Sequence, residues 1–250
     1  QDYAGCVWDP RVHIEDTIIE SIDEVDGILI TDLVTLELER TVIRDISMSE
    51  AQTGGCGMRV SGTADLRDVV IDNAGICGIG VEGSGQVTIS NLQVSQTGAA
   101  LAVQEQGQAE LTDTVVRDSE FAMKVWGPDA SAHGQRLMAL GTHYGVWVSD
   151  GATTTVEDAI LVTDVFGVRV TDAHFTATRI VVRDALWHGI EVHGAAAIAL
   201  LEDIHVTNCE VGGLFVAEGD VTVHRGEFNW NRDVGIWAHQ NAHVYLEDVA

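Results

Sequence analysis

The sequence of 250 residues has little proline, little positive charge and no long apolar run. It holds 2 Pro, and 13 basic residues face 39 acidic ones, which gives a formal net charge of −26. A nucleic-acid partner is therefore not expected, because phosphate recognition needs a basic surface. The longest apolar stretches, such as residues 195 to 201, are too short to span a membrane. A hydrophobic fraction of 46% nevertheless excludes a disordered acidic tail, which has too few apolar residues to bury.

Helical periodicity is missing as well, since no window of about ten residues shows it with caps. In its place a short unit recurs, a small residue followed by apolar, any and apolar residues. We call the small residue the anchor; it falls at Gly5, Gly27, Gly57, Gly78, Ala100, Ala122, Gly145, Gly167, Gly189, Gly213 and Gly235. The intervals are 22, 30, 21, 22, 22, 23, 22, 22, 24 and 22 residues. A repeat of this length indicates a solenoid rather than two separate globular domains.

Alternation of apolar and polar residues after each anchor predicts a short strand, and further strand-like pieces follow, such as residues 86 to 89 and 154 to 156. Three strands and three turns in about 22 residues describe one turn of a wide β-coil. The leucine-rich-repeat frame is absent, and the period is not a multiple of six, as left-handed hexapeptide helices require. The pattern resembles that of right-handed parallel β-helix repeat proteins, the pectate-lyase-like solenoids. The resemblance lies in the coil pattern alone and covers nearly the whole chain.

We therefore predict an all-β fold, a single-stranded right-handed parallel β-helix of about eleven coils that forms one domain over residues 1–250. The long interval between Gly27 and Gly57 predicts a corner-loop insertion near residues 47–55. Neither end shows a capping helix, and solenoid ends expose unpaired strand edges. The sequence thus predicts a segment of a longer protein, or end-to-end or lateral self-association.

In a parallel coil, equivalent residues of successive coils stack directly on one another and form columns. Alignment on the flanking strands gives a turn column of Asp113, Gln135, Asp158, Arg179, Asp203, Arg225 and Asp248. Its charges alternate in sign over the later coils, which relieves repulsion between stacked neighbours. We interpret this column as a structural turn ladder, with paired carboxylates for glycosidic chemistry or calcium as the other interpretation. No cofactor and no metal site is predicted.

Cys56 and Cys77 each precede an anchor on consecutive coils, so their Cα atoms should lie about one strand spacing apart, within disulfide range. A disulfide and a pair of stacked buried thiols both fit this spacing. The same column continues with four aromatic or imidazole rings, which by parity should face the core or pack at a corner. These rings are Phe121, Tyr144, Phe166 and His188.

The position two residues after each anchor should point outward, as should the position two residues further on. From the sixth coil onward these positions gather aromatic and charged side chains, namely Lys124, Trp126, Trp147, Arg169, Glu191, His193, Phe215, Trp237 and His239. Exposed aromatic rings beside charged groups form a contact surface on which sugar rings can stack. A glycan-binding face, a protein interface and plain surface all remain open on this pattern.

The family resemblance implies a polysaccharide as the partner and a secreted or cell-surface location. It does not extend to catalysis, since the paired-aspartate, Asn-Thr-Asp and Arg-Ile-Lys signatures of polygalacturonases and the clustered calcium aspartates of pectate lyases are missing. We therefore expect a structural, adhesive or glycan-binding rod with no catalytic residue. The alternative is a polysaccharide lyase or glycoside hydrolase that acts on the Lys124–His239 face, where Lys124 or Arg169 would neutralise a uronate carboxylate and His193 or Arg169 would take a proton.

Overall fold

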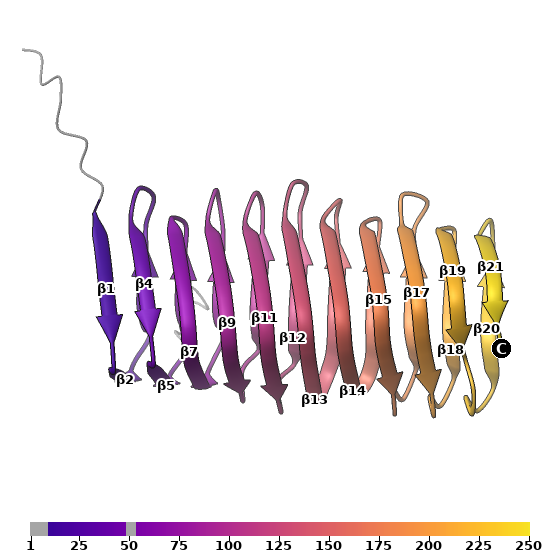
Figure 1. Ribbon diagram of the computed structural model, residues 1–250, viewed down its shortest axis with the longest axis horizontal. Coiled ribbons are helices and arrows are strands. Elements are labelled where there is room, and N and C mark those ends of the chain that lie inside the picture. The colour runs from indigo at the N-terminus through magenta and orange to yellow at the C-terminus, as the bar shows by residue number, and fades with distance from the viewer. Residues whose placement is uncertain (1–9, 49–53) are drawn as a thin grey trace, which may run out of the picture.

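The computed structural model describes residues 10–48 and 54–250, and within these ranges it contains strands and no helix. The strands lie side by side along a rod (Figure 1). They are β1 (Arg11–Glu15), β2 (Ile18–Ile22), β3 (Ile28–Ile30), β4 (Thr35–Glu39), β5 (Val42–Ile46), β6 (Cys56–Val60), β7 (Thr63–Ala74), β8 (Cys77–Val81), β9 (Gln86–Ser95), β10 (Ala99–Gln104), β11 (Gln108–Arg117), β12 (Phe121–Trp126), β13 (Ser131–Ser149), β14 (Thr153–Thr171), β15 (His174–Arg183), β16 (His188–His193), β17 (Ile198–Thr207), β18 (Gly212–Ala217), β19 (Asp220–Glu227), β20 (Val234–His239) and β21 (His243–Val249).

Every strand pairing is parallel, and each coil pairs with the coil before it and the coil after it. The third strand segment of each coil builds one sheet, which we call the third sheet: β3, β6, β8, β10, β12, the later parts of β13 and β14, then β16, β18 and β20. The predicted fold is confirmed as a parallel β-solenoid of about ten turns, with a spacing of about 23 residues. The first predicted anchor, Gly5, lies outside the described residues.

The anchors are small because their neighbours leave no room. A Cβ added at Gly145 would lie 2.3 Å from the backbone oxygen of Gly167 on the next coil. Anchor and following residue both face the core, as Ala122 and Met123 do at 2% and 0% exposure. Two successive inward residues reverse the alternation of the strand, so the residue before the anchor points outward. The rings of Phe121 and its column therefore stand on the outer face of the third sheet, and the prediction that they could face the core is wrong.

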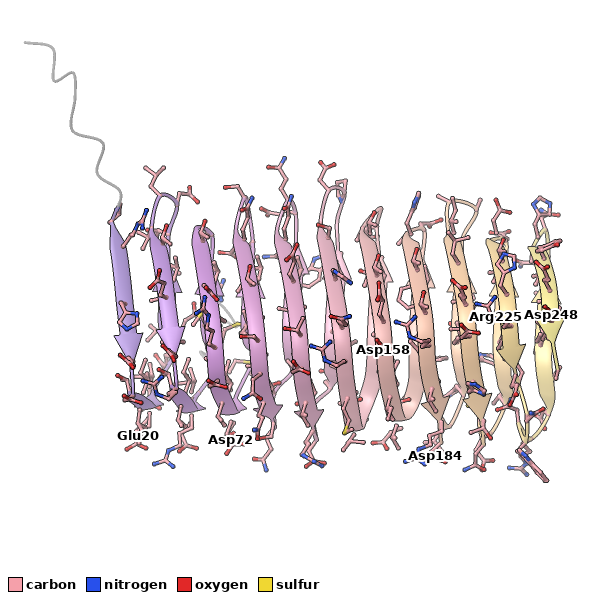
Figure 2. The ribbon with its side chains drawn as sticks, viewed as in Figure 1. Glu20, Asp72, Asp158, Asp184, Arg225 and Asp248 are labelled. Carbon is pink, nitrogen blue, oxygen red and sulfur yellow. A yellow bond between two sulfur atoms is a disulfide. The ribbon has the colours of Figure 1, made fainter. Side chains whose placement is uncertain are left out.

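The corner between the first two strand segments of each coil is a single residue in the left-handed region, with φ from +46° to +56°. Along the rod these residues are Asp16, Arg40, Asp68, Asn91, Asp113, Arg136, Asp158, Arg179, Asp203, Arg225 and Asp248. The strand register places Arg136, not Gln135, in this column, because Thr112 pairs with Gln135 and Gln135 with Glu157. Acid and base or amide thus alternate over eleven coils, and Figure 2 shows Asp158, Arg225 and Asp248 along this line.

Each basic or amide residue of this corner ladder reaches back to the acid of the preceding coil. Arg136 Nε and Arg179 Nε donate to Asp113 and Asp158 at 2.6 and 2.5 Å. The same contact holds the pKa of both aspartates below the ordinary value, through the hydrogen bond from the arginine first and its charge second. The ladder thus links consecutive corners through side-chain hydrogen bonds, and it lies away from the third sheet.

Cys56 and Cys77 are joined by a disulfide between β6 and β8, with their Cα atoms 4.4 Å apart. The predicted insertion near residues 47–55 falls between β5 and β6, and its residues 49–53 lie outside the described part of the chain. Among residues 10–48 and 54–250, no helix is long and apolar enough to cross a membrane.

Candidate functional site

The outer face of the third sheet brings all nine residues of the predicted contact surface together in two columns. The first column pairs Lys124, Trp147, Arg169, Glu191, Phe215 and Trp237 in register on successive strands from β12 to β20. The second column, two residues further along each strand, carries Trp126, His193 and His239, with Ser149, Thr171 and Ala217 between them. A third column stands beside them, the rings that precede the anchors.

A charged cluster occupies the centre of this face, on β14 and β16. Glu191 is 5% exposed, and its carboxylate contacts three nitrogen-bearing side chains. His188 Nδ1 lies 3.0 Å from Glu191 Oε2 in a hydrogen bond. His193 Nε2 and Arg169 Nε lie 2.8 and 3.3 Å from the other oxygen, Oε1. We call these four residues the Glu191 cluster.

The protonation of the Glu191 cluster follows from its charges. Burial alone raises the pKa of the Glu191 carboxyl, but the hydrogen bond from His188 and the charge of Arg169 outweigh burial, so the pKa lies below its ordinary value. An ionised carboxylate has no proton to donate. His188 Nδ1 and His193 Nε2 therefore carry the hydrogens that face it, because two lone pairs would repel at these distances. In the neutral imidazoles, His188 Nε2 and His193 Nδ1 are then the proton acceptors.

His188 Nε2 is buried and has no hydrogen-bond partner within the described ranges. The His188 ring stacks on Phe215, with centroids 4.8 Å apart and planes at 11°. On its other side lies Phe166, at 6.4 Å. A buried polar atom without a partner costs free energy, so this acceptor nitrogen is a position that a ligand hydroxyl group would satisfy by donating a hydrogen bond.

Aromatic side chains line a groove around the Glu191 cluster. Its walls are Tyr144, Val165, Phe166, Trp187, Val211, Phe215 and Trp237. Arg169 crosses it, with its guanidinium carbon 4.9 Å from the Trp147 ring and 5.3 Å from the Phe166 ring. A planar cation between two rings is held in place by cation–π attraction. The groove therefore combines flat apolar walls with a fixed cation and two imidazoles.

A second hollow continues the groove toward the N-terminal coils and shares Tyr144 with it. Its walls include Ala99, Phe121, Trp126 and Trp147, with Lys124 among them. The floor beside it is the apolar cluster of Cys56, Cys77, Ala99 and Phe121, which is separate from the core of the rod. The disulfide thus supports the outer face and not the interior.

The sequence pattern did not assign His188 or Trp187 to this face. Simple alternation places the residue before an anchor on the core side or at a corner, and it therefore predicts that position for His188. Trp187, 55% exposed, precedes β16 and lies 6.3 Å from the Phe166 ring. The signal that would have found His188 is the pair of consecutive small and apolar residues at each anchor, since two inward positions in succession reverse the parity; Trp187 lies before the strand, where alternation does not apply.

No protein-family model and no curated protein matches the chain. Solved structures match in fold. They include the catalytic unit of a thermostable GH87 alpha-1,3-glucanase from Streptomyces thermodiastaticus, with a TM-score of 0.49 and 11% identity over 93% of this chain and 63% of that one. The periplasmic alginate epimerase AlgG matches with a TM-score of 0.50 and 9% identity, over 96% of this chain and 72% of that one.

The catalytic domain of a GH87 alpha-1,3-glucanase in complex with tetrasaccharides matches with a TM-score of 0.50 and 9% identity, over 94% of this chain and 63% of that one. The chain thus spans less than two thirds of both glucanase structures. At these identities the likeness shows the fold. The chain is similar to pectate-lyase-like β-helix proteins, and these neighbours are carbohydrate-active enzymes.

Proposed function

We propose that the chain binds a polysaccharide along the outer face of the third sheet and acts on it as a polysaccharide lyase. The observation that supports this function is the Glu191 cluster in its aromatic groove. The same fold carries carbohydrate-active enzymes among the structural neighbours, which favours catalysis over the purely structural or adhesive rod that the sequence pattern suggests. The disulfide between Cys56 and Cys77 supports a location outside the reducing cytoplasm.

The chemistry would begin at the acidic hydrogen next to a uronate carboxylate. Arg169 pairs with that carboxylate and lowers the cost of forming a carbanion beside it. His193, whose side chain is 36% exposed, takes the proton on Nδ1 while Glu191 stabilises the imidazolium. The electron pair of the broken C–H bond forms a C=C bond to the adjacent ring carbon. The glycosidic C–O bond on that adjacent carbon breaks at the same time. The leaving oxygen takes a proton from solvent water, and the imidazolium of His193 later returns its proton to solvent, so the products are a new chain end and an unsaturated uronate.

A glycoside hydrolase fits this groove less well. Hydrolysis of a glycosidic bond uses two carboxyl groups on either side of the bond. Of the residues that line the groove around the cluster, Glu191 alone carries a carboxylate, and both of its oxygens already face His188, His193 or Arg169. Its lowered pKa also makes it a poor general acid, because it is ionised at neutral pH.

A glycan-binding rod without catalysis is the second candidate. The observation that favours it is the compensation inside the cluster, since the charge of Arg169 is balanced by Glu191 at 3.3 Å. Such a groove would hold sugar rings on its aromatic walls and leave the chain intact.

The proposed lyase activity is tested by measuring proton abstraction from the substrate. Oligomers of galacturonate, mannuronate and guluronate are incubated with the protein in deuterated water, and both ultraviolet absorbance of the unsaturated product and deuterium at the carbon next to the carboxylate are measured. We expect unsaturated product with one of these substrates, and its loss on Arg169→Ala and His193→Ala. Deuterium incorporation without cleavage would place the abstraction but not the elimination in this groove, and so would contradict the lyase.

Matched controls are an arginine and a histidine from strands outside the third sheet. Arg183→Ala and His174→Ala change exposed residues of β15 and should keep full activity. If the oligomers bind but yield neither unsaturated product nor deuterium incorporation, the lyase proposal is rejected in favour of the glycan-binding rod. Absence of both binding and turnover on all three uronates would overturn both.

A further inference from the structure

Lys124 is the only lysine in the sequence, and it lies in the hollow next to the Glu191 groove. Its Nζ stands 4.9 Å from the centroid of the Phe121 ring, 5.1 Å from that of Trp126 and 5.7 Å from that of Trp147. Three rings thus surround one ammonium group. Within the described part of the chain, no carboxylate forms an ion pair with it, although the sequence carries 39 acidic residues. Glu120 also lines this hollow but forms no ion pair with Lys124, so the position offers a positive charge without a direct ion-pair partner among mostly apolar walls.

The register relates Lys124 to the Glu191 cluster. Lys124 pairs with Trp147, and Trp147 pairs with Arg169, so the two cations stand in one column with one tryptophan between them. Neighbouring strands lie about 4.8 Å apart, which places the two positions roughly 10 Å apart along the rod. One coil is close to the length of one sugar unit in an extended chain. A polysaccharide parallel to the rod would therefore meet successive coils with successive units.

We propose that the Lys124 hollow is a second anion subsite, which binds the carboxylate of a uronate two units along the same chain from the unit at Arg169. This subsite rests on the proposed function, because it takes the Arg169 groove as the place where the first unit binds. In an extended chain close to twofold symmetry, every second unit presents its carboxylate on the same side. Trp147 then lies under the unit between them, whose carboxylate points away from the sheet.

The walls of the hollow favour a sugar acid over other anions. Phe121, Trp126 and Trp147 form apolar walls against which a sugar ring can pack, and the ammonium group lies over all three rings, within reach of a carboxylate on that sugar. The hollow and the Glu191 groove share Tyr144, so a chain can pass from one to the other without leaving the face.

The test compares uronate oligomers of two lengths by isothermal titration calorimetry. A dimer covers the Arg169 position without reaching Lys124, whereas a pentamer covers both. The third probe is the same pentamer with its carboxyl groups reduced to alcohols. We expect Lys124→Gln to weaken pentamer binding roughly tenfold, the effect of one charge-assisted contact, and to leave dimer binding unchanged. Lys124→Arg should keep most of the affinity. The matched control is Arg117→Gln, which removes an exposed charge from β11 and should change nothing.

Two results would overturn the subsite. One is unchanged pentamer affinity in Lys124→Gln; the other is an equal loss for the reduced pentamer, which would show that the lysine acts through packing alone. These outcomes are separate from those of the proposed function. Pentamer binding that depends on Lys124 without any proton abstraction would retain the subsite and reject the lyase, whereas turnover of the dimer with no role for Lys124 would do the reverse.

Discussion

Glu191 is the residue on which the arrangement of the candidate site depends. A carboxylate at 5% exposure is costly unless it is paired and hydrogen-bonded, and here His188 forms the hydrogen bond while His193 and Arg169 lie within ion-pair distance. The same contacts fix the hydrogens of both imidazoles on the nitrogens that face the carboxylate. Glu191 is therefore a positioning residue, because it decides which nitrogens are free to accept a proton.

The first prediction concerns the pH dependence of this carboxylate. Its folded pKa lies below the ordinary value of 4.5, so its contribution to stability is present above that value and is lost as pH falls through the folded pKa. Glu191→Gln should lower the free energy of unfolding by on the order of 2 kcal/mol at pH 7, and by less at pH 3. Urea unfolding followed by tryptophan fluorescence measures both values.

Glu227→Gln is the matched control for this measurement. Glu227 also contacts a histidine, His205, at 3.2 Å, but both side chains are more than half exposed. An exposed pair contributes little, so this variant should unfold as the unchanged protein does. A cost of Glu191→Gln that is as large at pH 3 as at pH 7 would show that packing, and not charge, accounts for it.

At the scale of the strand, the sequence predicts strand pairing well. It predicts less well whether each side chain points into the core or outward. The apolar columns one and three residues after each anchor are core residues, as Met123 and Val125 show at 0% exposure. The alternation of inward and outward side chains does not extend to the anchor itself, because the anchor and the residue after it both face inward. A period of two therefore does not predict that the column of Phe121 and His188 lies on the outer face. For the same reason it does not predict that His188 contacts Glu191.

The corner ladder shows a second limit of the same kind. Coil lengths vary by one or two residues, so the sequence permits two alignments of a turn column, and simple spacing selects Gln135 where the structure has Arg136. The backbone decides between them, since at this corner Arg136 and not Gln135 takes the left-handed conformation. Asp and Asn visit this region readily, whereas arginine occupies it here with an aspartate of the preceding coil to bind.

The second prediction tests the backbone of this ladder at Asn91. Its φ is +54°, and its side-chain amide donates to Asp68 at 2.5 Å. Asn91→Val should destabilise by about 1–2 kcal/mol, because a β-branched residue is disfavoured in the left-handed region. Asn91→Gly keeps that conformation at little steric cost and loses only an exposed hydrogen bond, so its effect should be smaller. Urea unfolding of the two variants gives the comparison, and equal losses would mean that the hydrogen bond matters and the conformation does not.

Across the whole molecule, the acidic residues and the aromatic face are separated in space. Many acids occupy left-handed corners, such as Asp45, Asp118, Asp172 and Asp184, in addition to those of the corner ladder. The groove and the hollow on the third sheet are lined by two carboxylates, Glu191 and Glu120, beside Arg169 and Lys124. The corners thus contribute part of the net charge of −26, and this charge surrounds a contact face that carries Lys124, Arg169 and several histidines.

The last prediction follows from this separation of charge. At distances beyond the groove, an acidic oligosaccharide meets the repulsion of the whole rod, and salt screens that repulsion as the Debye length falls from about 30 Å at 0.01 M to about 8 Å at 0.15 M. The association rate constant of a uronate pentamer should therefore rise with salt over this range. Its dissociation rate constant should rise too, because salt weakens the contacts at Lys124 and Arg169. Stopped-flow tryptophan fluorescence resolves both constants, and the carboxyl-reduced pentamer, which carries no charge, should show neither change. An association rate that falls with salt would mean that the local field of the groove, and not the charge of the rod, guides the ligand to the third sheet.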